Sequence, residues 1–291
     1  MDEDLLARRF EAHRPHLRSV AYRMLGSSGE AEDAVQETWL RLSRADTSEV
    51  ANLAGWLTTV IARVCLDLLR ARKARREDPM GGQMPEMAPE AGDGPEEDAL
   101  RAESVSRALL VVLDRLEPAE RVAFVLHDLF AVPFATIAPL VERTPAAAKK
   151  LASRARQRVR GRPVAAEREL ARHRQVVEAF LTAAHGGDLD ALLAVLDPDV
   201  VRRADPAALR PGAAAVLRGA RVVAGETVLL AARTRYAEPA LVNGAPGLVV
   251  APGGRLRFAL VVAVSNGKVT AYEVIADPAR LERLELAVLG T

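Results

Sequence analysis

The chain has 291 residues, which at ~150 residues per domain suggests two or three domains and excludes a single small module. Hydrophobic residues make up 49% and charged residues 27%, a balance that excludes a disordered or collagen-like protein. No apolar run approaches the ~20 residues that cross a bilayer. The first four residues are acidic rather than signal-like, and Cys65 is the sole cysteine. We therefore expect a cytoplasmic protein with no membrane partner.

Charge is separated along the chain although the net charge is only +1. Residues 143–162 hold eight basic side chains and no acidic one, whereas residues 78–103 hold eight acidic side chains and one basic one. A local excess of cations indicates a nucleic-acid contact more directly than net charge does.

Residues 1–77 predict an all-helical first domain. Within residues 30–42, apolar side chains recur at steps of three and four and predict a buried stripe of Ala31, Val35, Trp39 and Leu42. The opposite face carries Asp33, Gln36, Glu37 and Arg41, and is either merely solvated or docks a basic partner. A second helix, over residues 53–72, places Trp56, Val60, Val64 and Leu68 on one face and ends in the basic run 70–76. An aromatic side chain near cations suits unstacked bases, although Trp56 as plain core is an equal alternative.

Residues 78–103 are rich in proline, glycine and acid and predict a flexible linker. Residues 104–162 predict a second helical domain with helices at 134–141 and 145–159. Thr144 is a candidate N-cap after a tight turn, which is helix-turn-helix geometry. A solvated basic helix is the alternative for 145–159, but the eight cations without an acid over residues 143–162 favour DNA binding.

Residues 163–172 form a short connector to a third domain at 173–291, which we expect to be α+β. Helices are predicted at 172–185 and 189–196, and antiparallel strands from Val222 onward. The pairs Asn243–Gly244 and Asn266–Gly267 predict tight hairpins.

The helical motifs resemble a known family. Residues 29–42 look like region 2.2 of bacterial extracytoplasmic-function (ECF) sigma factors, residues 54–70 look like regions 2.3 and 2.4, and residues 113–121 with 152–156 look like region 4. The third domain is similar to the SnoaL-like domain of the SigJ-like subgroup, on residues 176–181, 187–192, 196–200 and 276–281. The resemblance implies a multidomain fold: two all-α sigma modules, the second with a helix-turn-helix, followed by an α+β, cone-shaped SnoaL-like domain.

The resemblance also implies partners and site residues. Core RNA polymerase would be bound through its β′ clamp helices, and also through its β subunit, with Asp33, Gln36, Glu37 and Arg41 on the clamp. The promoter −10 element would be read by Trp56, Arg63, Arg70, Arg72, Lys73, Arg75 and Arg76. The −35 element would be read by Thr144, Ala146, Ala147, Lys149, Lys150, Ser153, Arg154 and Arg156. The third domain would regulate the chain in cis through Asp205, Asp277, Pro278 and Arg280, so we expect no separate anti-sigma factor.

The alternative function is a helix-turn-helix regulator fused to a small-molecule-binding or cyclase/isomerase-like domain. Acid–base chemistry in such a domain needs a carboxylate or histidine with a shifted pKa, and the candidates are Asp205 and His185. Asp205 follows two arginines, which favours a paired carboxylate, and His185 closes a helix before two glycines. Metal-ligand spacing, a nucleophile elbow and a phosphate loop are absent from the sequence, so we expect no catalytic residue, cofactor or metal.

Overall fold

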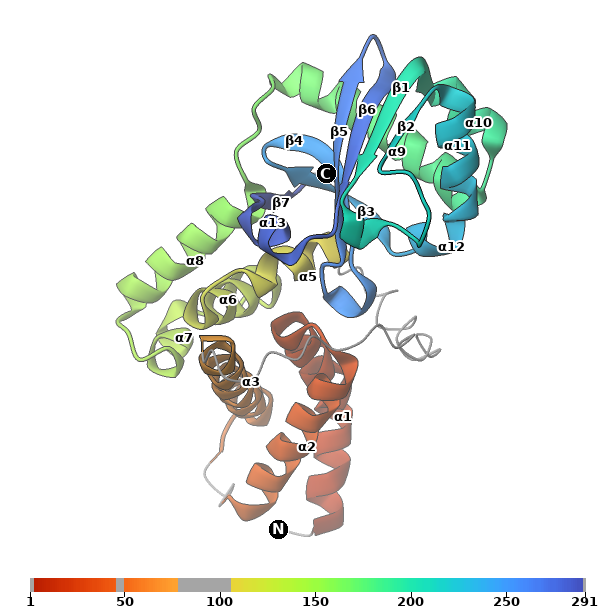
Figure 1. Cartoon of the computed structure of the whole chain (residues 1–291). Coiled ribbons are helices and arrows are strands. Elements are labelled where there is room, and N and C mark those ends of the chain that lie inside the picture. Colours follow the sequence, from red (N-terminus) through yellow and green to blue (C-terminus); the bar gives the residue numbers. More distant parts are fainter. Residues whose placement is uncertain (1–2, 46–49, 78–105, 290–291) are drawn as a thin grey trace. The chain divides into compact units, whose positions relative to one another are not determined.

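The computed structural model describes residues 3–45, 50–77 and 106–289 (Figure 1). The chain divides into two compact units, which we call the helical unit and the sheet unit. The helical unit comprises Met1–Val105 and Leu113–Arg156, and the sheet unit comprises Ser106–Val112 and Gln157–Thr291. The predicted acidic linker, 78–103, lies outside the described residues.

The helical unit starts with α1 (Glu3–Leu25), α2 (Ser28–Arg44) and α3 (Leu53–Glu77). It continues with α6 (Pro118–Phe124), a π-helical turn (Val125–Leu129), α7 (Phe134–Leu140) and the first part of α8 (Pro145–Arg160). Ser27 caps α2, because its hydroxyl accepts a hydrogen bond from the Glu30 amide at 3.4 Å. Pro118 stands in the first turn of α6, where the N–H that proline lacks has no helical partner.

The predicted apolar stripes are confirmed for α2 and shifted for α3. On α2, Ala31, Val35 and Leu42 are buried, and half-buried Trp39 packs against Phe10 with ring centroids 5.1 Å apart. On α3 the apolar face from Trp56 to Leu68 is only partly buried, at Val64. Trp56 and Val60 are half-buried and Leu68 is exposed, whereas the buried apolar positions are Leu53, Leu57, Ile61, Ala62, Val64, Cys65, Leu66 and Leu69. The reason is that α3 packs on several sides, so its core-facing surface is wider than one stripe.

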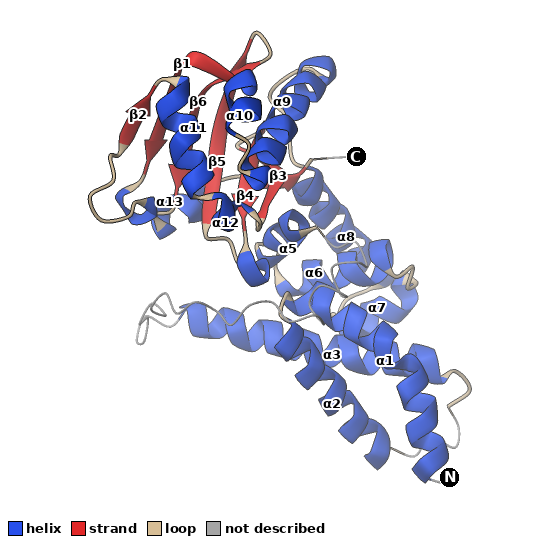
Figure 2. Ribbon diagram, turned by 90° about the vertical axis from the view of Figure 1, so that its right-hand side faces the viewer, coloured by secondary structure: helices blue, strands red, loops and turns tan. Residues whose placement is uncertain are grey.

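The sheet unit contains one seven-stranded sheet and the helices that cover it (Figure 2). The strands are β1 (Leu196–Ala204), β2 (Val216–Arg218), β3 (Ala237–Val242), β4 (Ala245–Val250), β5 (Phe258–Ser265), β6 (Lys268–Ile275) and β7 (Leu286–Val288), in the spatial order β2-β1-β6-β5-β4-β3-β7. The helices are α5 (Arg107–Asp114), α9 (Glu167–Gly186), α10 (Leu189–Val195), α11 (Ala220–Leu229), α12 (Ala231–Thr234) and α13 (Pro278–Arg283). The α+β class predicted for this domain is confirmed.

Both faces of the sheet are apolar and covered. One face packs against α9, α10 and α11 and buries Phe180, Leu192, Val223 and Tyr272. The other face carries alternate strand residues, including Ala240, Val242, Val249 and Ala259, and packs against α5 and the segment from α13 to β7. Alternation along β3 and β4 therefore supplies two separate cores from the same strands.

The two predicted hairpins are confirmed. Asn243 and Gly244, and likewise Asn266 and Gly267, all have positive φ, as a tight two-residue turn requires.

Two expectations for the third domain are wrong. The β-branched run after Val222 forms α11 and α12, because Val223 and Thr227, four residues apart, are both buried on one helix face, so packing overrides strand propensity. The sheet is also not wholly antiparallel, since β1 pairs with β6 in parallel after the long excursion through β2 to β5.

Candidate nucleic-acid interface

A helix-turn-helix is present in the helical unit. Helix α7 ends at Leu140, Glu142 has a φ of +55°, and α8 begins at Pro145. The Thr144 hydroxyl accepts a hydrogen bond from the Ala147 amide at 3.2 Å, so the predicted N-cap is confirmed. The positive φ at Glu142 is the feature that reverses the chain between the two helices.

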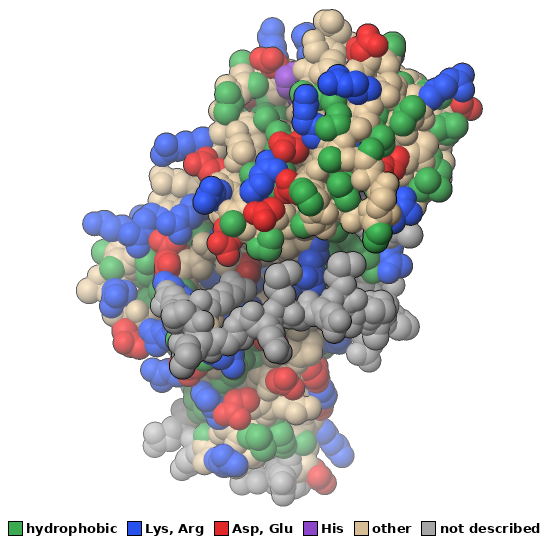
Figure 3. Space-filling view, viewed as in Figure 1, with side chains coloured by type: hydrophobic (Ala, Val, Ile, Leu, Met, Phe, Trp, Pro, Cys, Tyr) green, Lys and Arg blue, Asp and Glu red, His purple; other side chains and the backbone are tan. Residues whose placement is uncertain are grey.

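Helix α8 presents one packed face and one basic face. Ala148, Leu151, Ala152 and Ala155 are buried. Thr144, Ala146, Lys149, Lys150 and Arg154 are exposed, and Ala147, Ser153 and Arg156 are partly exposed. Figure 3 shows basic side chains gathered over α8. The predicted −35 residues thus lie together on the accessible part of the second helix, where a recognition helix meets the major groove.

Two of the arginines of α8 are paired with acids of the same unit. The Arg154 Nε lies 3.1 Å from a Glu120 carboxylate oxygen, and the Arg156 Nε donates to Asp128 at 2.7 Å. These pairs hold the guanidinium groups beside the helix, and Glu120 is itself buried, so in that pair only the arginine faces solvent. Within α8, Lys149 and Lys150 are the exposed cations closest to the turn, and the turn itself carries exposed Arg143.

Helix α3 carries a second candidate surface. Trp56, Arg63 and Arg70 stand seven residues apart, so they lie along one face of the helix. Trp56 is half-buried, and Arg63 and Arg70 are exposed. An aromatic ring followed by guanidinium groups on one helix face is a surface on which unstacked bases and their phosphates can be bound.

The basic end of α3 meets acids of α6 and of the helix-turn-helix. Arg70 Nη1 donates to Glu142 at 3.2 Å, and Lys73 Nζ donates to Glu117 at 2.7 Å. Arg72 is only 19% exposed and binds Glu30, the Leu25 carbonyl and, at 3.7 Å, Asp114. Arg72 is therefore held by contacts within the helical unit, whereas Arg75 is exposed and the side chain of Arg76 lies outside the described part.

The predicted polymerase face of α2 is accessible. Asp33 and Gln36 are exposed, and Glu37 accepts a hydrogen bond from Arg41 at 2.9 Å one turn later. Leu40, 44% exposed, adds an apolar side chain to the same region of the helix. The face therefore combines carboxylates with an apolar contact, which is suited to a protein partner that carries cations.

A buried arginine in the helical unit escaped the sequence analysis. Arg121 on α6 is 2% exposed and pairs with Asp114 at 3.3 Å, and its Nε has no hydrogen-bond partner. Burial lowers the pKa of Arg121 to about 10, although the nearby Asp114 opposes that shift. Burial likewise raises the pKa of the Cys65 thiol to about 12, so that thiol is protonated and unreactive. No periodicity or motif distinguishes a buried arginine from the exposed ones around it.

The third-domain residues considered for regulation or catalysis have their hydrogen-bond partners inside the sheet unit. The Asp205 carboxylate accepts hydrogen bonds from the Ala276 and Asp277 amides, both at 3.1 Å, and pairs with Arg280. Burial opposes ionisation of Asp205, but these three donors outweigh it and hold its pKa below the ordinary value. Asp277 caps α13, and Pro278 is its first residue. His185, at the end of α9, is hydrogen-bonded to the Thr234 carbonyl.

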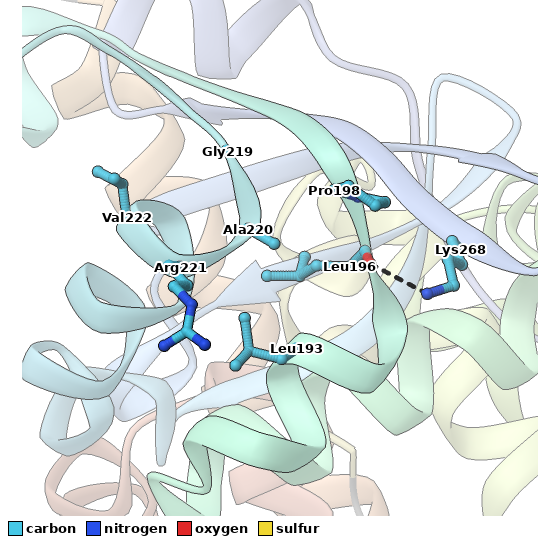
Figure 4. Close-up of a pocket in the computed structure, with 8 residues that line it drawn as sticks. All are labelled: Leu193, Leu196, Pro198, Gly219, Ala220, Arg221, Val222 and Lys268. Carbon is cyan, nitrogen blue, oxygen red and sulfur yellow. Dashed lines mark hydrogen bonds between the residues drawn. The ribbon is translucent and has the colours of Figure 1, made fainter.

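A pocket of about 490 Å³ lies beside α10, β1 and α11 (Figure 4). Its lining is mostly apolar, and Arg221 and Lys268 are its two titratable side chains. Neither Asp205 nor His185 lines it, so the pocket does not contain the acid–base candidates. Among the described residues, no group of three or more His, Cys, Asp or Glu side chains could hold a metal ion. Over the same ranges, no helix has the length and hydropathy of a membrane span.

Comparison with known proteins identifies the family. Sigma-70 region 2 matches residues 9–75, and Sigma-70, region 4 matches residues 106–159. The ECF RNA polymerase sigma factor SigJ of Mycobacterium tuberculosis is 41% identical over 287 residues, covering 92% of this chain and 91% of that protein. A probable ECF RNA polymerase sigma factor, SigI, of the same species is 36% identical, covering 99% of this chain and 98% of that protein. The crystal structure of M. tuberculosis SigJ, 38% identical, covers 94% of this chain and 98% of its own, with a TM-score of 0.46. Two region-specific matches and full-length relatives of this identity show that the chain belongs to the ECF sigma factors, as its motifs predicted.

Proposed function

We propose that this sigma factor brings core RNA polymerase to promoters by means of two DNA-reading helices and that its C-terminal domain regulates it in cis. Helix α8 reads the −35 element, and the α3 face with Trp56, Arg63 and Arg70 binds the −10 element and its opened strand. The observation that carries the proposal is the presence of two separate accessible basic helices in one chain. A plain helix-turn-helix repressor needs only one such helix.

The polymerase contact is assigned to α2. Asp33, Gln36, Glu37 and Arg41 line a polar face whose opposite side is already packed, so this face is available to a partner without unfolding the helix. The partner of these residues is the β′ clamp helices of the polymerase. The β subunit and promoter DNA complete the set of partners, and no separate anti-sigma factor is required.

The chain alone binds DNA weakly. Two cations of α3, Arg70 and Lys73, are paired with Glu142 and Glu117, so their charges are partly neutralised by this protein's own carboxylates. Binding to polymerase replaces those contacts and exposes the cations to phosphate. Because the pairs are solvent-exposed, each contributes only ~0–1 kcal/mol, and polymerase binding can break them.

The C-terminal domain acts by packing rather than by chemistry. Inside the sheet unit the buried polar groups satisfy one another. Arg202 pairs with Glu226 and donates to the Ala214 carbonyl, and the Tyr272 and Thr227 hydroxyls lie 3.2 Å apart. A catalytic carboxyl group needs access to substrate, and a general acid also needs a raised pKa, whereas Asp205 is only 9% exposed, has a lowered pKa and is bound by backbone amides.

Run-off transcription with purified core polymerase tests the proposal. We expect transcripts from a cognate promoter, a strong loss when either the −10 or the −35 element is replaced, and weak binding of the free protein to the same duplex. Tight, sequence-specific binding by the free protein that core polymerase does not change would establish the repressor instead. Turnover of a small molecule that is lost in Asp205→Asn would establish the enzyme.

A further inference from the structure

The first helix of region 4 belongs by its packing to the sheet unit. Region 4 covers residues 106–159, so α5 is its first helix. Yet Ser106–Val112 groups with the C-terminal domain and not with the rest of region 4. The family assignment and the packing of the chain therefore disagree about one helix.

The packing of α5 is extensive for so short a helix. Ala108, Val111 and Val112 are 1%, 3% and 2% exposed, and they share one core with sheet residues. The sheet contributes Ala240, Val242, Val249, Ala259 and Ile275 to that core, all from the face that α9, α10 and α11 do not cover. Without α5, this part of the sheet and three apolar side chains of region 4 would be exposed to water.

One polar side chain of the same face binds the start of α5. Glu238 on β3 is two residues before Ala240 and so lies on the same side of the strand. Its Oε2 accepts hydrogen bonds from the Ser106 hydroxyl at 2.7 Å and from the Ala108 amide at 3.1 Å. Its Oε1 lies 3.5 Å from Arg107, whose guanidinium also stands 5.5 Å from the centre of the Tyr236 ring.

These contacts matter because α5 cannot be stable alone. It has eight residues, and isolated helices of fewer than ~12 residues are marginal in water. A carboxylate at a helix N-terminus satisfies otherwise unpaired amides and interacts favourably with the helix dipole. Glu238 supplies both effects from outside region 4.

We infer that the sheet face around Ala240 and Val242, with Glu238 at its edge, is the docking surface for the first helix of region 4, and that through it the C-terminal domain supports −35 recognition. This inference rests on the proposed function and gives the regulation a direction. The C-terminal domain would therefore increase promoter recognition, because it supplies the packing partner of the first region 4 helix. Removing the whole domain would therefore also remove the packing partner of α5.

Hydrogen exchange on the full-length chain, without polymerase, tests the docking. We expect Glu238→Ala to accelerate exchange in α5 roughly five- to tenfold, the effect of losing a good helix cap, with strands β4 and β5 unchanged. Glu238→Gln keeps an acceptor oxygen for Ser106 and Ala108 and should restore most of the protection. Glu282→Ala, at an exposed carboxylate on α13, is the matched control. Unchanged exchange in α5 for Glu238→Ala would overturn the docking surface.

Transcription then tests the regulatory part with the same variants. The ratio of run-off transcript from a promoter with its −35 element to that from one without it should fall several-fold in Glu238→Ala and not in Glu282→Ala. If α5 exchange accelerates while this ratio is unchanged or rises, support of −35 recognition is refuted. If wild-type protein gives no transcript, the proposed sigma function fails, whereas the exchange result still decides the docking.

Discussion

Replacing the buried Arg121 by methionine should stabilise the helical unit. The lowering of the Arg121 pKa from 12.5 to about 10 corresponds to about 3 kcal/mol by which the fold disfavours the charged guanidinium. Because the pKa is lower in the folded than in the unfolded chain, this penalty is full below about pH 10 and is relieved only as the pH rises above that value. The penalty is therefore fully present at neutral pH.

Methionine removes the penalty and keeps most of the volume. Asp114 loses one partner, but its side chain is 34% exposed and still lies 3.7 Å from Arg72, so it is not left as an unpaired buried charge. Imperfect packing of the new side chain costs up to ~1.5 kcal/mol. We therefore expect Arg121→Met to raise the free energy of unfolding by about 1–2 kcal/mol, as when other buried ion pairs are replaced by apolar residues.

Urea titration followed by tryptophan fluorescence measures this unit selectively, because Trp39 and Trp56, the only tryptophans, both lie in it. Arg121→Ala is the matched control and should be less stable than Arg121→Met by ~2 kcal/mol or more, because it also removes the charge but leaves a cavity. Equal destabilisation of the methionine and alanine variants would refute the reasoning and show that the guanidinium itself holds the helices together.

Three further predictions concern the surfaces. Asp33→Ala combined with Glu37→Ala should weaken co-purification with core polymerase and leave the circular dichroism spectrum unchanged; undiminished co-purification would contradict the α2 assignment. Lys149→Ala should weaken promoter binding by the holoenzyme and reduce the slope of log affinity against log salt by roughly one, as for one lost phosphate contact. An unchanged slope would mean that Lys149 is merely solvated. Since the pKa of Asp205 is lowered in the fold, its stabilising contribution is present above the unfolded value and is lost as the pH falls below about 4; Asp205→Asn should show a smaller loss of sheet-unit stability in that range, measured by acid titration of the circular dichroism signal.

Much of the fold could be predicted from local pattern. The hairpins at Asn243–Gly244 and Asn266–Gly267 follow from residues that tolerate positive φ, and the cap at Thr144 follows from a hydroxyl placed before Pro145. Such signals act over two to four residues, so the rest of the chain does not change their meaning.

Predictions that depended on which face is buried were less successful. The β-branched run after Val222 is helical because its environment buries every fourth residue, and the stripe predicted on α3 is displaced because several helices pack around α3. The ion pairs could not be predicted either. Nothing near Arg70 or Lys73 in the sequence indicates that Glu142 and Glu117, far along the chain, pair with them. The buried helix faces and the ion pairs all depend on contacts between residues far apart in the sequence.

The packing of α5 could not be predicted from the sequence, because its family assignment and its packing partner lie in different parts of the chain. Family comparison places α5 in region 4, yet Ala108, Val111 and Val112 are buried by strands β3 to β6, which begin more than a hundred residues later. A helix that packs on one side needs only one apolar face. In α5, Leu110 and Leu113 are buried in addition to the three residues that pack on the sheet. Apolar residues around most of its circumference are thus typical of a helix that is buried on more than one side. Sequence and packing agree least where a segment serves two domains, which is also where one domain can influence the other.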